Sequence, residues 1–310
     1  MPRALPPRAV LAAALGLVAA LAGCTGRSTA PRAEDPRRPT ITVASFDFPE
    51  SETLAELYGQ ALRGGGYPVE VISRLGSREI VEPALEQGKV DLVPEYMGSA
   101  LDFLGDLALA ASADPRQTHA RLEQAFGPRG VSVLAYAPAQ DRNGFVVTAQ
   151  TARTYRLRRV SDLGRVAGRF ALGGPPECPE RPLCLQGLER TYGLHFERFE
   201  PMPTRTVTAT ALEEGEIDVG MIDTTDANLA TRELLQLADD RRLQPADNLV
   251  PVVRRQVLDA YGPRLVRLLD SVTAPLTTPA LIGLNRQVEV DELAPASVAA
   301  AWLRAHPPAA

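Results

Sequence analysis

The sequence predicts an α/β protein built from two similar lobes, with a ligand cleft between them. A nine-residue segment occurs twice, at residues 84–92 and 211–219, and both copies fit A-L-E-x-G-x-[VI]-D-[LV]. Each copy has the pattern of a helix end, a glycine suited to a left-handed C-cap, and a short buried strand. The length of 310 residues, 45% of them hydrophobic, suits about two domains. One such segment would be a common helix ending, but two copies in the same downstream register indicate a structural unit that is carried twice.

Four residues beyond the Asp-Leu or Asp-Val pair of each copy, the chain must leave the strand. Tyr96 and Asp223 stand at these two positions. In open parallel α/β sheets, ligands bind at the carboxyl ends of the strands. We therefore expect both residues to lie at a ligand-binding edge, although a buried Asp223 with a structural role is the alternative.

The first lobe begins with a β-branched strand and continues through two helix and strand units. Helical spacing and glycine or proline boundaries mark its elements, expected at residues 40–46, 52–62, 68–72, 77–87, 99–104, 115–126 and 130–135. Gly64, Gly65 and Gly66 would suit a phosphate loop only if they opened a helix and preceded Lys-Ser/Thr. They follow a helix instead, so a C-cap is the better interpretation.

Residues 138–143 are expected to cross into the second lobe, and a strand at 248–253 to return to the first. Between the crossings we expect strands at 144–148 and 169–172, a helix or loop near 161–163, and a helix near 186–192. The second repeat helix and its strand follow and end at Asp223. The return is followed by helices expected at 256–271, 276–288 and 294–305. The predicted lobes are therefore 40–142 plus 249–310 for lobe I, and 143–248 for lobe II.

Composition argues against some partners. The net charge is −5 and the pI near 5.4, and no Lys/Arg-rich stripe appears. Nucleic acid is therefore not an expected partner.

The N-terminus has the order of an export signal. Arg3 and Arg8 precede an apolar run over residues 9–22, which is short for a membrane span of about 20 residues. Leu-Ala-Gly-Cys, which ends at Cys24, resembles the lipobox of bacterial lipoproteins. This resemblance implies a lipoprotein signal peptide at 1–23 and lipidation of Cys24. An ordinary signal peptide with a chance cysteine is the alternative. The polar, proline-rich residues 24–39 are expected to be a flexible tether that anchors the protein to the outer face of the cytoplasmic membrane.

Cys178 and Cys184 are the other two cysteines, and outside the cytosol such a pair is more often bridged than free. A metal site would need further ligands, and His119, His195 and His306 show no ligand spacing. We therefore expect a disulfide and no metal.

A set of motifs in this order resembles a known family. They are SFDFPES, LAELYGQAL, LGSREIVEPALEQGKVDLVPEYMGSAL, PAQDRNGFVVT, GGPPECPERPLCLQGLERTYGL, ALEEGEIDVGMIDTTDA and VVRRQVLDAYG. Together they resemble the substrate-binding lipoproteins of ABC importers for glycine betaine, choline, carnitine and related osmoprotectants. The resemblance implies a periplasmic-binding-protein fold of type II, with two crossovers and a central cleft. It also implies closure on a small solute, docking on membrane permease subunits, no cofactor, and a monomer.

In this family a quaternary ammonium sits in an aromatic cage, where each ring contributes about 0.5–2 kcal/mol by cation–π attraction. Matching motifs implies that Tyr96 is a cage ring with Ser99 nearby, and that Phe46 and Asp47 touch the ligand. The second lobe is expected to add Asn143, Glu177, Arg181, Asp223, Thr224 and Thr225. Arg181 would bind an anion or clamp the lobes, and a surface cation is the alternative.

The chain departs from the family pattern where many members have further aromatic residues. Asn143 and Asp223 stand at two of these positions, and the second crossing, QPADNLVP, also lacks an aromatic residue. A four-ring cage is therefore not expected. Either carboxylates such as Asp47, Asp223 and Asp141 bind the cation by direct charge, or the ligand is not a methylammonium compound.

Two other functional classes compete with solute import. A hydrolase needs a nucleophile beside a base, and no histidine lies in a cleft motif, so we do not expect an enzyme. A ligand-sensing lipoprotein that signals to a membrane receptor would carry the same motifs, and the sequence alone does not separate it from an import protein.

Overall fold

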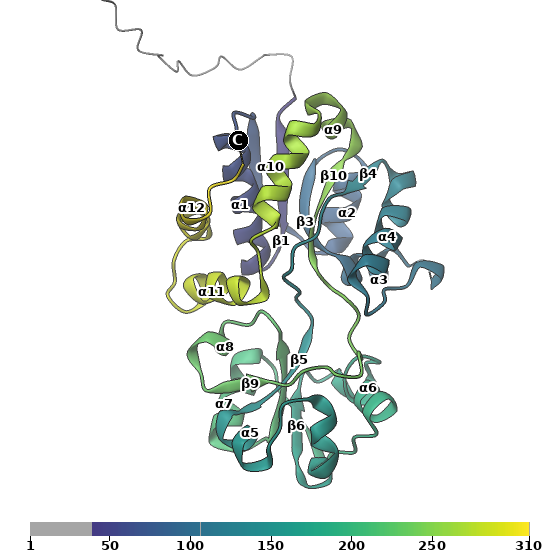
Figure 1. Cartoon of the computed structure of the whole chain (residues 1–310), viewed down its shortest axis with the longest axis vertical. Coiled ribbons are helices and arrows are strands. Elements are labelled where there is room, and N and C mark those ends of the chain that lie inside the picture. Colours follow the sequence, from purple (N-terminus) through teal and green to yellow (C-terminus); the bar gives the residue numbers. More distant parts are fainter. Residues whose placement is uncertain (1–38, 106, 310) are drawn as a thin grey trace, which may run out of the picture. The chain divides into compact units, whose positions relative to one another are not determined.

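The computed structural model describes residues 39–105 and 107–309, which belong to one compact unit. The predicted signal peptide, Cys24 and the tether up to residue 38 lie outside the described residues. Two five-stranded sheets organise the described chain (Figure 1). We call each sheet with its own helices a lobe, and number the lobes in chain order.

Lobe I has the strand order β2-β1-β3-β10-β4. Its strands are β1 (Ile41–Phe46), β2 (Val69–Gly76), β3 (Leu92–Tyr96), β4 (Val131–Val133) and β10 (Leu249–Arg254). β1 pairs in parallel with β2 and β3, and β10 runs antiparallel to β3 and β4. The sheet is therefore mixed, because the strand that returns from the second crossover enters it in the opposite direction.

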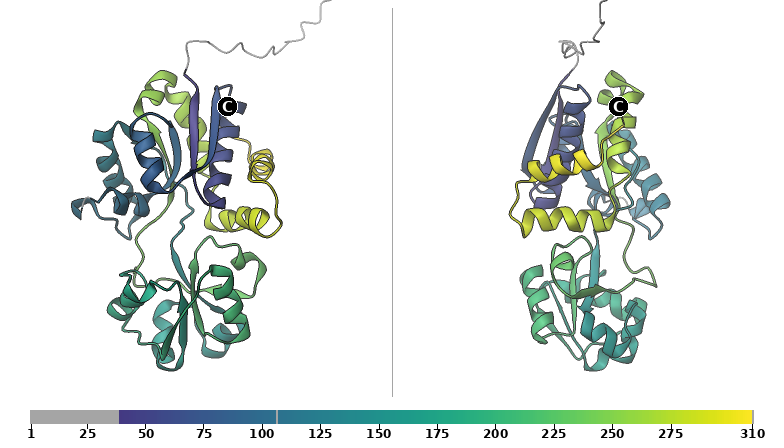
Figure 2. Two further views of the ribbon diagram at one scale, coloured as in Figure 1. Left: turned by 180° about the vertical axis from the view of Figure 1, so that it is seen from behind. Right: turned by 60° about the vertical axis from the view of Figure 1, so that its left-hand side comes forward.

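Helices cover both faces of this sheet. Those of the N-terminal part are α1 (Pro49–Gly64), α2 (Arg78–Glu86), α3 (Met97–Leu104) and α4 (Pro115–Phe126), with 3-10 turns at Leu107–Leu109 and Gly127–Arg129. The C-terminal part adds α9 (Arg255–Tyr261), α10 (Pro263–Thr273), α11 (Thr278–Glu289) and α12 (Pro295–Ala305). Figure 2 shows α11 and α12, in yellow, beside α1, and all three are in contact.

Lobe II repeats the same plan, with the strand order β7-β6-β8-β5-β9. Its strands are β5 (Asn143–Thr148), β6 (Ala171–Gly174), β7 (Arg198–Pro201), β8 (Val219–Asp223) and β9 (Leu234–Gln236). The helices are α5 (Ala149–Tyr155), α6 (Leu185–Gly187), α7 (Arg205–Glu214) and α8 (Asn228–Thr231), with a π-helical turn at Leu188–Tyr192 and 3-10 turns at Val160–Arg165, Ala167–Arg169 and Cys178–Glu180. Here β6 is parallel to β7 and β8, and β5 is antiparallel to β8 and β9. The repeat seen in the sequence is thus a repeat of sheet topology.

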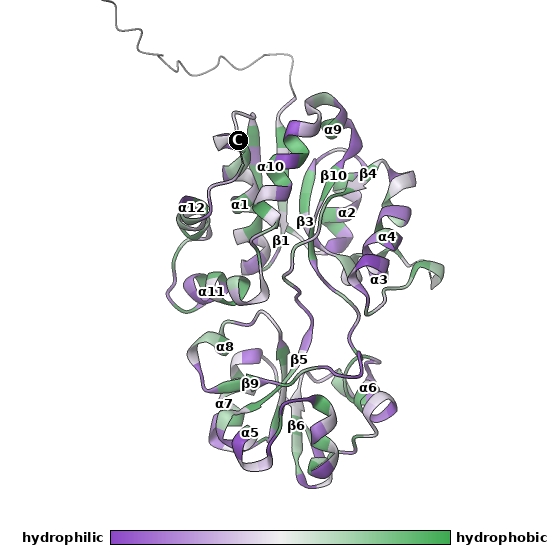
Figure 3. Cartoon of the chain, viewed as in Figure 1, coloured by the Kyte–Doolittle hydropathy of each residue, from purple (hydrophilic) through white to green (hydrophobic). Residues whose placement is uncertain are grey.

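The lobe I sheet buries side chains on both faces, as expected when helices cover both sides. Along β3, Leu92 packs with Leu54 and Leu57 of α1, whereas its neighbour Val93 packs with Leu85 of α2 on the other face. The central strands are accordingly mostly apolar, and the polar residues concentrate on the helices (Figure 3).

Several elements differ from the sequence-based expectations. The helix predicted at 256–271 is two helices, because Gly262, with φ of 71°, ends α9 before Pro263 begins α10. The helix predicted at 186–192 has a π-helical second part. The periodicity also gave no sign of α5, β7, α8 and β9, which are all short.

Two chain segments connect the lobes, one before β5 and one before β10. An isolated antiparallel bridge joins them at Gln140 and Asn248. The Thr224 hydroxyl ties the end of β8 to the first segment, because it donates to the Gln140 carbonyl at 2.9 Å and accepts from the Arg142 N–H at 3.1 Å. This predicted site residue therefore holds the connection between the lobes.

Candidate ligand-binding site

The two repeat helices begin alike and place an arginine at each strand end. Ser77 precedes α2 and Thr204 precedes α7 as N-cap residues, and Arg78 and Arg205 are the first helical residues. The offset between the two copies, from Ala84 to Ala211, also relates these arginines. Each of them reaches a carboxylate at the end of its own lobe's repeat strand.

In lobe I this carboxylate is Glu95, which is fully buried. Arg78 donates to it through Nε at 2.5 Å and through Nη2 at 3.0 Å, a bidentate pair. The guanidinium also lies over the Phe46 ring, 4.9 Å from its centroid. Glu82 of α2 is buried nearby; burial first, and then the charge of Glu95, raises its pKa to about 9.

In lobe II the partner of Arg205 is Asp223, the last residue of β8. This pair is less buried, since the side chains are 60% and 24% exposed. Burial raises the pKa of Asp223 even though the Arg205 charge opposes the shift. Asp223 thus lies at the strand end that the repeat predicted, with a cation beside it.

Tyr96 belongs to a buried hydrogen-bond path that joins the lobes. Its hydroxyl donates to Glu50 Oε1, and Glu50 Oε2 accepts from Asn285 Nδ2 of α11. Asn285 Nδ2 also donates to the Thr225 carbonyl of lobe II at 2.9 Å. Side chains from α1, β3 and α11 therefore meet the β8–α8 turn at one point.

Acidic side chains surround this path. We use the name acidic cluster for Glu50, Asp141 and Asp223, with Asp226 and Glu289 beside them. Burial, reinforced by the charge of Asp223, raises the pKa of Glu50. Burial, then the charges of Glu50 and Asp223, raises the pKa of Asp141 well above its usual range. Several carboxylates in one poorly solvated place make a site that favours positive charge.

One wall beside the path is aromatic. The Phe46 and Phe48 rings are stacked at 6.0 Å, and Phe48 lies 6.3 Å from the Tyr96 ring. Phe46 and Tyr96 are buried, whereas Phe48 is 36% exposed. Phe48 is therefore the ring of this group with the most surface free to touch a solute.

Other predicted site residues have partners of their own. Ser99 donates its hydroxyl to Asp247 Oδ2 at 2.7 Å, and Asp247 also accepts the Gly98 N–H at the start of α3. Burial raises the pKa of Asp247 to about 6. Asp47 is exposed and forms an ion pair with Arg74 at 2.8 Å. The Asp47 ion pair thus lies just after the end of β1, and the Ser99 hydrogen bond just after the end of β3.

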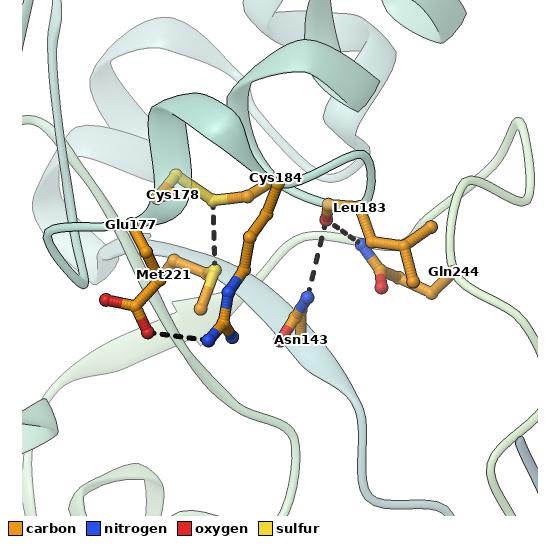
Figure 4. The surroundings of a disulfide bond; sticks show 8 residues. Asn143, Glu177, Cys178, Leu183, Cys184, Met221 and Gln244 are labelled. Atoms are coloured by element: carbon orange, nitrogen blue, oxygen red, sulfur yellow. Dashed lines mark hydrogen bonds and ion pairs between the residues drawn. A yellow bond between two sulfur atoms is a disulfide. The ribbon is translucent and has the colours of Figure 1, made fainter. Parts of the chain in front are cut away.

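Glu177 and Arg181 lie in the disulfide loop of lobe II, and Asn143 contacts this loop from β5 (Figure 4). Cys178 and Cys184 are bonded, with Cα atoms 5.2 Å apart, which confirms the predicted bridge. The exposed Arg181 is paired with Glu177 at 2.8 Å, within the same loop. Asn143 Nδ2 donates to the Leu183 carbonyl at 3.4 Å, and Gln244 donates to the same carbonyl at 2.8 Å. The loop is therefore tied to both connecting segments.

Two cavities of the described residues lie in lobe II away from the acidic cluster. One of about 170 Å³ is lined in part by Arg142, Asn143 and Arg158, and one of about 480 Å³ by Arg153, Arg156 and Leu235. Neither includes a member of the cluster. We therefore base the site on buried polar groups and their contacts.

Five residues of this region are not among the site residues predicted from the sequence: Phe48, Glu50, Arg78, Arg205 and Asn285. Extending the repeat alignment upstream pairs Ser77-Arg78 with Thr204-Arg205 and would have found both arginines. Phe48 and Glu50 lie two and four residues after Phe46, the last residue of the first strand, which is a weaker signal. Nothing in the local sequence marks Asn285, because its partners are 235 and 60 residues away.

The chain matches the family model described as the substrate-binding domain of the ABC-type glycine betaine transport system, over residues 39–305. It belongs to this family. A glycine-betaine-binding protein of Pseudomonas aeruginosa is 29% identical over 86% of this chain and 88% of its own. The glycine betaine-binding protein YehZ of Escherichia coli is 28% identical over 85% of this chain and 90% of its own.

Solved structures give the same result for the fold. Apo YehZ superposes with a TM-score of 0.78 at 27% identity, covering 86% of this chain and 99% of that one. A glycine betaine/carnitine/choline ABC transporter structure gives 0.79 at 24% identity, covering 86% and 98%. The predicted two-lobed binding-protein fold is confirmed. Across residues 39–105 and 107–309, no helix is both long and apolar enough to cross a membrane.

Proposed function

We propose that this protein captures a small cationic or zwitterionic osmoprotectant, such as glycine betaine, choline or a similar solute, by closure of its two lobes. It then delivers the solute to the permease of an ABC importer. The observation that carries the proposal is the acidic cluster at the contact between the lobes, where Asn285 of lobe I meets the Thr225 carbonyl of lobe II. A positive ligand held there touches both lobes and so stabilises the closed arrangement.

Import is favoured over signalling to a receptor, because the matched family is defined by a transport system. No catalytic step is proposed. The protein acts outside the cytoplasm, as substrate-binding proteins of importers do. The candidate ligand residues remain those named from the sequence, to which Phe48, Glu50, Asp141 and Asn285 are added.

A thermal-shift screen tests the ligand class. Betaine, choline, carnitine, ectoine, proline, polyamines and sugars are compared, since a ligand at a hundredfold excess over its Kd stabilises the folded form by about 2.7 kcal/mol. Tyr96→Ala and Asp223→Ala should weaken binding of the best compound. Glu213→Ala should not, because Glu213, on α7, is paired with Arg232 and lies outside the acidic cluster. A neutral sugar as the best compound, or wild-type affinity in Tyr96→Ala, would refute the assignment.

We further propose that the mature chain is lipid-anchored through Cys24 to the outer face of the cytoplasmic membrane and works as a monomer. Labelling cells with a tagged fatty acid tests the anchor. The wild-type protein should carry label and Cys24→Ala should carry none. Equal labelling of both would remove the anchor from the proposal.

A further inference from the structure

Two buried oxygen atoms beside the acidic cluster accept no hydrogen bond from any described residue. They are Oδ1 of Asn285 and Oδ1 of Asp141. Asn285 is only 3% exposed, so bulk solvent does not reach its amide. Buried acceptors in folded proteins are nearly always satisfied, which makes two of them at one place informative.

The orientation of the Asn285 amide follows from its neighbours. Glu50 Oε2 and the Thr225 carbonyl are both acceptors, so the NH₂ group must point toward them. The two N–H donors are then used, and Oδ1 is left as an acceptor. An ionised Asp141 carboxylate can only accept. Burial raises the pKa of Asp141, but a bound cation favours the ionised form. With a cation bound, both atoms therefore call for a donor.

The charge balance points in the same direction. Within the described part of the chain, Glu50, Asp141, Asp226 and Glu289 form no ion pair, and Arg205 is already paired with Asp223. Arg181, the residue expected to hold an anionic group, is paired with Glu177 in the disulfide loop. These four carboxyl groups thus lack a cationic partner among the described residues, while both of these arginines are already engaged by carboxylates.

A trimethylammonium zwitterion suits this arrangement poorly. Its nitrogen carries no N–H, and its carboxylate would meet other carboxylates. The structure also offers one partly exposed ring, Phe48, beside the buried Tyr96, which is less aromatic surface than a full cage needs.

We propose that the site selects a ligand of net positive charge that donates N–H hydrogen bonds, a primary or secondary ammonium, in preference to a quaternary ammonium. The N–H groups are directed to Asn285 Oδ1 and Asp141 Oδ1, and Phe48 covers the carbon skeleton. This inference rests on the proposed capture of a small positively charged solute at this site, and it favours solutes similar to choline that keep N–H groups on the ammonium.

A methylation series tests it at constant charge. Ethanolamine, N-methylethanolamine, N,N-dimethylethanolamine and choline are all cations at pH 7 and carry three, two, one and no N–H groups. Isothermal titration calorimetry on the full exported chain should show affinity falling with each methyl group. We expect at least a tenfold difference between ethanolamine and choline, or about 1.4 kcal/mol. Glycine and glycine betaine, which are zwitterions, should each bind more weakly than the amino alcohol with the same ammonium group.

Asp141→Asn removes a charge at nearly constant size, and should reduce the ethanolamine-to-choline ratio to below about threefold. Asp259→Asn is the matched control, since Asp259 is exposed on α9, and should keep the wild-type ratio. Choline or glycine betaine binding as tightly as ethanolamine in the wild type would overturn the inference and leave the proposed function standing. Absence of binding by all six compounds would overturn both. If Asp141→Asn does not fold, the affinities of the wild-type protein for the six compounds still distinguish these outcomes.

Discussion

The equivalent aspartates of the two repeat copies have the same role, whereas the residues at the two strand ends have different roles. Asp91 Oδ2 accepts the Thr42 N–H of β1 at 3.0 Å, and Asp218 Oδ2 accepts the Ala171 N–H of β6 at 2.8 Å. Each aspartate thus fastens the loop before its repeat strand to the start of the neighbouring parallel strand. The shared residue is structural in both lobes, and the difference between the lobes begins after it.

At the strand ends, the arginine–carboxylate pair is more buried in lobe I than in lobe II. Arg78 makes a bidentate bond to the fully buried Glu95, and the next residue, Tyr96, turns its hydroxyl to Glu50. In lobe II the equivalent Arg205 is 60% exposed and pairs with Asp223. Lobe I therefore supplies a preorganised polar framework, and lobe II supplies an accessible ion pair.

The largest expected effect comes from breaking the shared aspartate. Asp91→Ala should lower the free energy of unfolding by about 2–3 kcal/mol, and Asp218→Ala by about 1–2 kcal/mol, because each leaves a backbone N–H without its acceptor. Asp91 loses more because it also binds Arg254 at 3.1 Å. Urea unfolding measures both, with the exposed Asp259→Ala as control. If both variants match the control, the shared task is wrongly assigned.

The second effect concerns a feature of lobe II alone. Replacing Cys178 and Cys184 with serine should lower the free energy of unfolding by about 2 kcal/mol, as the chain-entropy model gives for a short loop. Denaturant unfolding of the double variant, compared with the oxidised wild type, checks this value. A loss below about 0.5 kcal/mol would mean that the bridge serves only to shape the loop that carries Arg181.

The third test concerns Glu82, a position of the repeat helix at which the two copies differ. The offset that relates Arg78 to Arg205 relates Glu82 to Ala209. The pKa of Glu82 is raised to about 9 from an ordinary 4.5, so the folded state holds this proton more tightly than the unfolded state. The contribution is fully present below pH 4.5 and is lost as pH rises toward 9, at up to about 1.4 kcal/mol per pH unit. Glu82→Gln should remove this loss and raise the stability at pH 8 by about 1 kcal/mol or more.

Unfolding curves at pH 5, 7 and 8 for the wild type and Glu82→Gln make the measurement. The two proteins should differ increasingly as pH rises. Parallel pH profiles would show that Glu82 is ionised in the folded protein.

The smallest effect is at the helix-ending glycines. Gly88 and Gly215 have φ of 74° and 75°, a region in which a Cβ is strained, so each change to alanine should destabilise by about 1 kcal/mol. A Cβ at Gly88 would also come within 2.6 Å of the Arg254 guanidinium, whereas nothing lies within 4 Å of one at Gly215. Thermal unfolding should therefore rank Gly88→Ala below Gly215→Ala by a few tenths of a kcal/mol. The reverse order would mean that Arg254 moves aside freely.

Features that depend on residues close in the sequence could be predicted from the sequence. The repeat copies predicted two strands that end at Tyr96 and Asp223, and both strands do end there. Gly88 and Gly215 marked the ends of the repeat helices. The bridge between Cys178 and Cys184 was predicted because they are the two cysteines left in a chain expected to be exported. Backbone conformation, local capping and short-loop closure leave a record within a few residues, so they can be predicted from the order of the chain.

Which groups meet at the site depends on the tertiary structure, because these residues are far apart in the sequence. Glu50, Tyr96 and Asn285 come from α1, β3 and α11, and Thr225 comes from the other lobe. Arg181 and Asp47, chosen by motif, form ion pairs with neighbouring residues of their own surface, and their ligand roles stay predictions. Burial determines whether a carboxylate keeps its proton and whether an amide oxygen lacks a donor, and burial is set by the packing of distant segments.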